Sequence, residues 1–100
     1  MSAVTVLKVE HGWAGDRKRN RLIFTCASTD ADSLAPSAAG LQEIEAIIPT
    51  GRAGTIDGNT VVAAAAFDYN VGTDVLVTYT PEGAATQVSS GNFEAYVFGK

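Results

Sequence analysis

The chain has few of the residues that build disulfides, metal centres and nucleophilic sites. Its 100 residues include one cysteine, Cys26, and one histidine, His11. A lone cysteine cannot close an internal disulfide, and one Cys with one His provides too few ligands for a zinc site. Because Cys26 lies within an apolar run, we expect it to be a small buried hydrophobic residue. No nucleophile motif surrounds His11, which is expected to be a turn residue.

Long apolar segments, phosphate-loop motifs and excess positive charge are missing as well. The longest apolar run, 61–67, is too short to span a bilayer, and the first ten residues lack the apolar stretch of a secretory signal. We therefore expect synthesis in a cytoplasm and no membrane partner. The GxGxxG and GxxxxGK spacings do not occur. The net charge of −4 counts against nucleic acid as the main partner, and no residue pattern indicates a cofactor, a metal or an enzymatic activity.

Short segments rich in Val and Thr, separated by turn signals, predict an all-β fold. We expect a single domain over residues 1–100, built as a small β-sandwich or a partly closed barrel. The segment 60–69 is assigned to a strand rather than a helix because it contains β-forming residues and no polar helical face. The predicted strands are 3–10, 20–26, 42–48, 60–69, 74–80 and 93–98.

One short helical turn is predicted near residues 35–40. Ser33 can cap it, Pro36 suits its first position and Gly40 ends it. The strand that follows alternates and places one set of residues on its buried face: Ile44, Ala46 and Ile48.

Two turns and one aromatic residue complete the expected fold. Asp57-Gly58 is a turn signal inside the loop 50–59, and the segment 70–73 is a hairpin turn. Trp13 lies between two glycines and is expected to fold back over one end of the core.

Two acidic patterns could carry chemistry, but each has a simpler explanation. Glu43 and Glu45 could form a carboxylate pair on one strand face, although a solvated face that discourages edge pairing explains them better. The segment 68–74 has oxygen ligands at alternate positions, as a calcium loop has. Its glycine is misplaced for an EF-hand and no glutamate closes the frame, so a hairpin turn is the better interpretation.

A basic cluster is the most prominent charged feature. It contains four of the seven basic residues: Arg17, Lys18, Arg19 and Arg21. One interpretation is a solvated hairpin tip. The other is a docking patch for an acidic surface of a partner protein, because Arg binds carboxylates through paired hydrogen bonds. Nucleic acid is a weaker option because no aromatic residues are interleaved with these cations.

The order of several motifs resembles small virion structural proteins of tailed bacteriophages. In those proteins a Leu-Thr-Pro-x-x-Leu-Gly-Leu-like turn precedes an Ile-x-x-Ile/Val-Pro strand, and the chain ends in a strand closed by a small and a basic residue. The corresponding segments here are His-Gly-Trp-Ala-Gly at 11–15, Arg-Lys-Arg-Asn-Arg at 17–21, Ser-Leu-Ala-Pro-Ser-Ala-Ala-Gly-Leu at 33–41, Glu-Ile-Glu-Ala-Ile-Ile-Pro at 43–49, Val-Leu-Val-Thr-Tyr at 75–79 and Phe-Glu-Ala-Tyr-Val-Phe-Gly-Lys at 93–100.

The resemblance implies a non-enzymatic capsid decoration, or cement, protein on the outside of a virion. Its partners would be the major capsid protein and further copies of itself, as a homotrimer. Two alternatives remain open: a tail, neck or baseplate component, and a carbohydrate-binding β-sandwich. The residues expected at the partner interface are Trp13, Arg17, Lys18, Arg19 and Arg21. The aromatic residues that could stack on a sugar are Trp13, Tyr69, Tyr79 and Tyr96.

Overall fold

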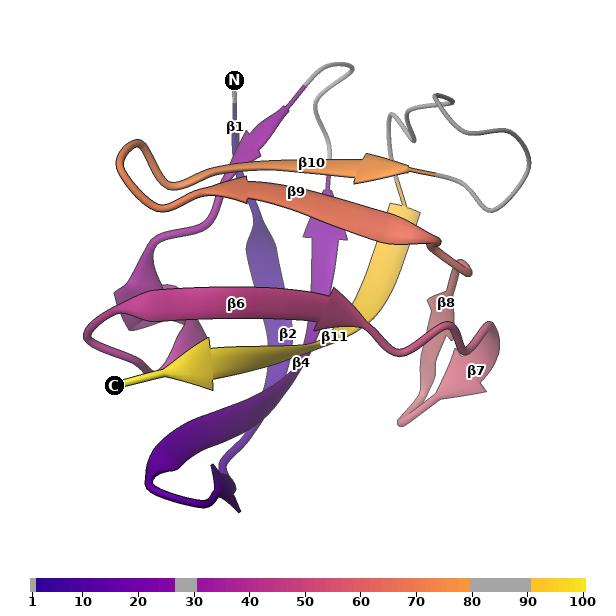
Figure 1. The fold of residues 1–100 in the computed structure, drawn as a ribbon. Coiled ribbons are helices and arrows are strands. Elements are labelled where there is room, and N and C mark those ends of the chain that lie inside the picture. The colour runs from indigo at the N-terminus through magenta and orange to yellow at the C-terminus, as the bar shows by residue number, and fades with distance from the viewer. Residues whose placement is uncertain (1, 27–30, 80–90) are drawn as a thin grey trace.

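A computed structural model describes residues 2–26, 31–79 and 91–100, and it has the predicted all-β fold. Two sheets face each other, with β9 and β10 of sheet A crossing above sheet B in Figure 1. In spatial order, sheet A contains β1 (Ser2–Ala3), β5 (Asp32–Ser33), β10 (Val75–Tyr79) and β9 (Ala66–Asn70). Sheet B contains β2 (Thr5–Glu10), β4 (Arg17–Cys26), β11 (Gly91–Gly99) and β6 (Ile44–Pro49), and β3 (Trp13–Ala14) also pairs with β4. Neighbouring strands are antiparallel, except that β1 and β5 are parallel.

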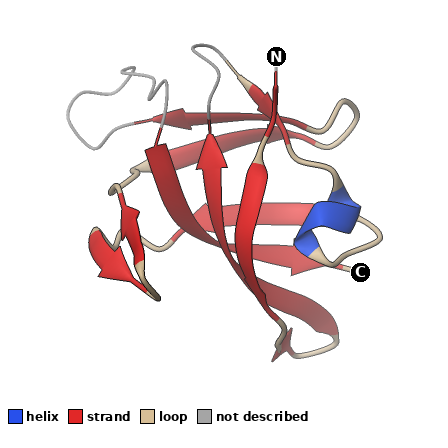
Figure 2. Cartoon of the chain, turned by 180° about the vertical axis from the view of Figure 1, so that it is seen from behind, coloured by secondary structure: helices blue, strands red, loops and turns tan. Residues whose placement is uncertain are grey.

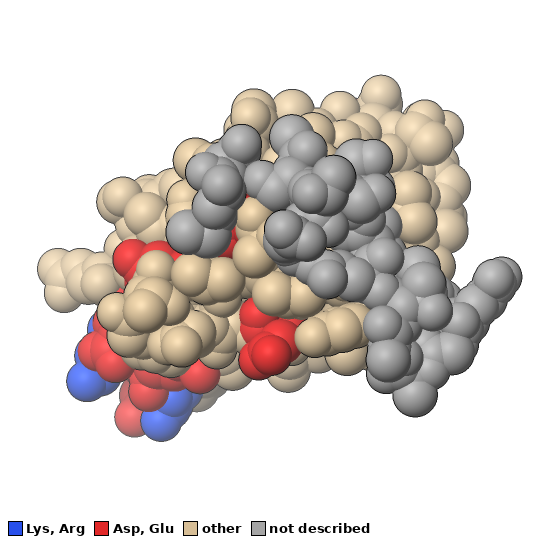
Figure 3. Space-filling view, turned by 90° about the horizontal axis from the view of Figure 1, so that it is seen from above, with Lys and Arg blue, Asp and Glu red and all other residues tan. Residues whose placement is uncertain are grey.

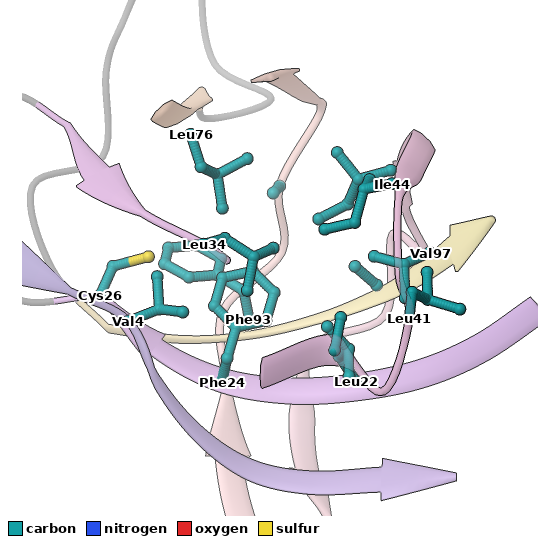
Figure 4. Close-up of a cluster of buried hydrophobic side chains, with 14 residues drawn as sticks. Val4, Leu22, Phe24, Cys26, Leu34, Leu41, Ile44, Leu76, Phe93 and Val97 are labelled. Atoms are coloured by element: carbon teal, nitrogen blue, oxygen red, sulfur yellow. The ribbon is translucent and has the colours of Figure 1, made fainter. Parts of the chain in front are cut away.

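The main hydrophobic core lies between the two sheets, as Figure 4 shows. The rings of Phe24, Phe67 and Phe93 meet with centroids 5.9 to 6.2 Å apart, so both sheets contribute to one aromatic cluster. Leu76 of sheet A is buried against the same cluster. Cys26 is also buried there, as predicted, and this burial, with Asp32 nearby, raises the pKa of its thiol to about 12.

The helical turn is a 3₁₀ helix, η1 (Pro36–Ala39). Pro36 occupies its first position and Gly40 ends it in the left-handed conformation, as predicted. The predicted cap is wrong: Ala35 is the residue before the helix, no side chain caps it, and Ser33 belongs to β5. Figure 2 shows this turn beside the last residue, Lys100, whose carbonyl accepts the Gln42 N–H at 2.6 Å.

The predicted buried face of the strand at 42–48 is wrong because β6 contains an irregularity. Phe98 pairs with Ala46 and Gly99 pairs with Ile44, so Glu45 is an extra residue in the ladder. Such a bulge reverses the alternation beyond it. Ile44 is therefore buried together with Ile47, whereas Ala46 and Ile48 are exposed.

The segment 50–69 contains more structure than predicted. A third sheet is formed by β7 (Gly54–Ile56), which lies in the expected loop, and β8 (Asn59–Val61), which begins at the end of that loop. Its turn is the predicted Asp57-Gly58, and both residues have the positive φ, 51° and 82°, that a type I′ turn requires. The predicted strand 60–69 is divided into the end of β8 and the whole of β9, with 62–65 outside both strands.

The hairpin β7–β8 covers one part of the outer face of sheet B. The Val62 N–H donates to the Asn92 carbonyl at 2.8 Å, which ties the end of this hairpin to β11. Two buried hydrophobic residues, Ile23 and Val61, lie outside the main core. Ile23 is on the outer face because it alternates with the core residues Leu22 and Phe24.

Candidate docking surface

The strands β3 and β4 form an arm that extends beyond the rest of sheet B at the bottom of Figure 1. We call residues 13–18 the β3–β4 arm. Its turn is Gly15-Asp16, and Gly15 has a φ of 68°, the positive value that a type II′ turn needs at its first central residue. At the base of the arm, the Arg19 N–H donates to the Gly12 carbonyl at 2.9 Å. The arm is therefore an ordered hairpin.

Trp13 is exposed and does not belong to the core cluster, so the prediction that it covers one end of the core is wrong. Its cross-strand partner is Lys18, which lies outside the core on the arm side of Leu22, the core residue of β4 that is nearest to the arm. The Trp13 side chain is consequently 64% exposed. Directly opposite residues share a face of the sheet, so Trp13 and Lys18 face one side of the arm. Arg17, which pairs with Ala14, faces the other side.

The predicted basic cluster does not form one surface. Arg17 remains 54% exposed while it pairs with Glu45 at 2.6 Å. The guanidinium carbon of Arg19 lies 5.3 Å from the centre of the Tyr96 ring, in cation–π contact on the outer face of sheet B. Arg21 is only 13% exposed, so it belongs to the interior of the molecule rather than to a docking patch.

Arg21 is the centre of an ion-pair network beneath the β7–β8 hairpin. Its guanidinium donates to Glu94 at 2.5 Å, to Asp57 at 2.6 Å and to Glu10 at 3.1 Å. The hydrogen bond with Asp57 is the largest cause of its raised pKa, and the same contact, with a smaller one from Lys8, lowers the pKa of Asp57. Arg21 therefore fastens the turn of this hairpin to sheet B.

Glu94 is the buried acidic partner in this network, and its side chain is fully shielded from solvent. The Thr50 hydroxyl donates to one carboxylate oxygen at 2.7 Å, and the Arg52 guanidinium contacts both oxygens. Burial would raise the pKa of Glu94, but the hydrogen bonds from Arg52, Thr50 and Arg21 together outweigh it and lower the pKa to about 2. A carboxylate with so low a pKa and such complete pairing does not act as a general acid near neutral pH.

The acidic patterns of the sequence have structural roles. Glu43 precedes β6 and Glu45 is engaged by Arg17, so the two carboxylates do not lie together on one strand face. The segment 68–74 includes the β9–β10 hairpin turn, as predicted, where the Asn70 side-chain oxygen accepts the Gly72 N–H at 2.9 Å. In the part of the chain that the structure describes, no group of three His, Cys, Asp or Glu side chains gathers as a metal site would require.

The aromatic residues considered for sugar binding lie on different surfaces. Tyr69 packs against the core and donates its hydroxyl to the Leu34 carbonyl at 2.7 Å, so its ring is not free to stack on a ligand. Tyr96 lies on the outer face of sheet B beneath Arg19, and Tyr79 is on the outer face of sheet A, opposite Ala66. Of the four candidates, Trp13 is the one with a strongly exposed ring.

Comparison with protein-family models, with curated proteins and with solved structures finds no match to this chain. Within the described residues, no helix is long and apolar enough to cross a membrane.

Proposed function

We propose that this chain is a non-enzymatic structural protein of a tailed-bacteriophage particle, and that it binds as a decoration protein to the outside of the major capsid protein lattice. The β3–β4 arm is the docking element. Trp13 is its anchor, and Arg17 and Lys18 supply positive charge for an acidic capsid surface. The order of motifs that resembles small virion proteins supports the particle, and the geometry of the arm supports the docking element.

The observation that carries this proposal is the exposure of Trp13 on an ordered hairpin. An exposed indole at this position adds nothing to the main core, which is complete without it. Trp and Arg are the side chains most enriched at the energetic centres of protein interfaces. On a repetitive lattice, many copies bind at once, so a small arm with a modest affinity is sufficient.

The first experiment is the copy number of this chain in purified particles, measured by mass spectrometry with isotope-labelled peptides of this chain and of the major capsid protein. A copy number comparable to that of the capsid subunit is expected of a decoration protein. A number far below it would place the chain in the tail, neck or baseplate instead. Absence from the particle would contradict every form of the virion proposal.

The second experiment tests the arm itself. We expect Trp13→Ala to reduce binding to undecorated capsids about tenfold or more, because a buried interface Trp contributes at least ~1.4 kcal/mol. Val71→Ala is the matched control, since Val71 is 51% exposed in the turn of another hairpin.

The paired neutralisation Arg17→Gln with Lys18→Gln should weaken binding most at low salt. Arg21 is left intact because its loss would disrupt the ion-pair network. Wild-type occupancy for the Trp13 variant would remove the arm from the proposal.

A carbohydrate-binding function is the second candidate, and the same exposed indole is the observation in its favour. An exposed ring can stack on the apolar face of a sugar. A glycan-array signal that Trp13→Ala abolishes, from a chain that is absent from particles, would favour this function. The loss of capsid binding by the same variant would favour the decoration protein.

A further inference from the structure

The basic residues of this molecule are confined to one of its two sheets. All seven basic residues lie on strands of sheet B or in the segments that directly follow them: Lys8, Arg17, Lys18, Arg19, Arg21, Arg52 and Lys100. Sheet A and its connections within 31–34 and 62–79 contain three acidic residues and no basic one. In Figure 3, which looks down on the molecule from the side of sheet A, basic residues show only at the lower left, beside acidic ones, and a separate acidic group shows near the centre.

The outer face of sheet A has a hollow with an acidic edge. Asp68 lies opposite Val77 and Asn70 opposite Val75, so these four side chains share the face that points away from the core. Together with Thr73 they line a hollow of about 380 Å³. Asp68 is exposed and makes no ion pair with any described residue, and the described part of sheet A and its connections contains no basic residue.

The outer face of sheet B has an open patch beside the part that the β7–β8 hairpin covers. This patch is apolar and carries a positive charge, whereas the edge of the hollow is acidic. Ile48 lies opposite Tyr96, and Phe98 lies between Ala46 and Arg19 in the neighbouring row. Ile48 is 51% exposed. We call these five residues the Arg19 patch. Among the described residues no carboxylate pairs with Arg19, whose guanidinium contacts the Tyr96 ring instead.

We propose that copies of this chain associate head to tail, with the Arg19 patch of one copy in the Asp68 hollow of the next. Arg19 then pairs with Asp68, and Ile48 covers the floor formed by Val75 and Val77. The alternative contacts between like faces are disfavoured, because two sheet A faces would oppose acidic residues and two Arg19 patches would oppose cations. A head-to-tail contact closes into a ring or continues as a filament, depending on the rotation between copies.

The inference names surfaces for the self-association that the proposed function only implies, and it rests on the charges of the described residues. The patch is small, so we expect a dissociation constant of roughly micromolar to millimolar order. Its test uses the purified chain without capsids, so failure of capsid binding and failure of this contact are separate results.

The test is a charge exchange followed by sedimentation velocity at protein concentrations up to about 1 mM. Wild type should show species larger than the monomer whose proportion increases with concentration. Arg19→Asp and Asp68→Arg should each raise the dissociation constant at least about tenfold, because each places like charges together. An equimolar mixture of the two variants should regain association, since Arg19 of one meets Asp68 of the other, and the new Arg and Asp also pair. Recovery in the mixture shows that both variants are folded.

Glu43→Arg is the matched control for the charge reversal, because Glu43 is exposed, makes no ion pair with a described residue and belongs to neither the Arg19 patch nor the Asp68 hollow. It should associate as wild type does. Wild-type protein that stays monomeric at the highest concentration would overturn the proposal. Loss of association in Arg19→Asp but not in Asp68→Arg would also overturn it, since that pattern belongs to a symmetric contact between two Arg19 patches.

Discussion

Glu94 lies on a strand whose neighbouring residues, Phe93 and Ala95, are core residues on the opposite face. Strand alternation places Glu94 on the outer face of sheet B, where a carboxylate is ordinarily solvated. The β7–β8 hairpin and Arg52 cover it instead. Paired in this way, the carboxylate stabilises the fold only while it is charged, since burial of an unpaired charge is very costly.

The first prediction concerns this carboxylate. Its pKa is about 2 in the folded protein and 4.5 ordinarily, so its stabilising contribution is present above about pH 4.5 and is lost as the pH falls towards 2. The shift corresponds to about 3 kcal/mol of unfolding free energy. We expect Glu94→Gln to be less stable than wild type by roughly that amount at pH 7, and the difference to shrink towards pH 2. Urea unfolding across this pH range measures both.

Glu43→Gln serves as the comparison, because Glu43 is exposed and makes no ion pair with a described residue. Its unfolding free energy should match that of wild type at each pH. A stability difference for Glu94→Gln that is the same at pH 7 and near pH 2 would mean that the charge of Glu94 is not what the network stabilises.

Sequence reasoning succeeded at residues whose environment follows from their own segment, and it failed where a distant segment decides. Cys26 was correctly predicted to be buried because its strand alternates regularly with the core. Arg21 and Arg17 look equivalent in the basic cluster, yet only Arg21 lies where Glu94 and Asp57 converge. Those partners are 73 and 36 residues away along the chain. No local pattern indicates that pairing.

At the scale of the elements, the irregularity in β6 depends on one close backbone approach. Gly99 lies opposite Ile44, and an added Cβ there would lie 1.9 Å from the Glu43 carbonyl oxygen. The Lys100 N–H donates to that same carbonyl at 3.1 Å, so the two segments cannot separate without losing a hydrogen bond. Gly99 therefore permits the bulge that brings Ile44 to the core.

The second prediction follows from this approach. Gly99→Ala should destabilise the protein by about 3 kcal/mol, because the backbone of β6 must move to accept the methyl group. Gly51→Ala provides the contrast: Gly51 has a φ of 75° and open space around it, so it should cost only the ~1 kcal/mol of a left-handed alanine. Thermal unfolding of both variants measures the difference. Equal destabilisation would show that β6 can shift freely away from β11.

Most elements could be predicted from the sequence, but the bulge in β6 and the full hairpin β7–β8 could not. The strand β10 and the turns at Gly40, Asp57-Gly58 and 70–73 have local signals, and all were confirmed. The bulge at Glu45 depends on a glycine in β11, which is more than fifty residues away in the sequence. A strand of three residues such as β7 is too short to show a period of two.

At the scale of the whole molecule, the two outer faces differ in charge, and the net charge calculated from the sequence does not reveal this difference. The described part of sheet B and its connections contains seven basic and six acidic residues, whereas the sheet A side has acidic residues alone. Composition predicted an acidic protein, and it could not indicate this separation, because strands of the two sheets alternate irregularly along the chain. A molecule with two unlike faces is suited to polar, head-to-tail contacts.

The third prediction uses this charge separation to distinguish the forces that hold copies together. If Arg19 and Asp68 dominate the proposed contact, raising NaCl from about 0.05 M to about 0.5 M shortens the Debye length severalfold and should weaken association. If Ile48 and the valine floor dominate, association should persist or strengthen, because apolar burial is not screened by salt. The melting temperature of the monomeric Arg19→Asp variant is measured alongside. It should change little, since the central Arg21–Glu94 pair of the network is shielded from solvent and weakly screened. Sedimentation velocity at both salt concentrations then separates the two contributions, and we expect the charged pair to be the larger one.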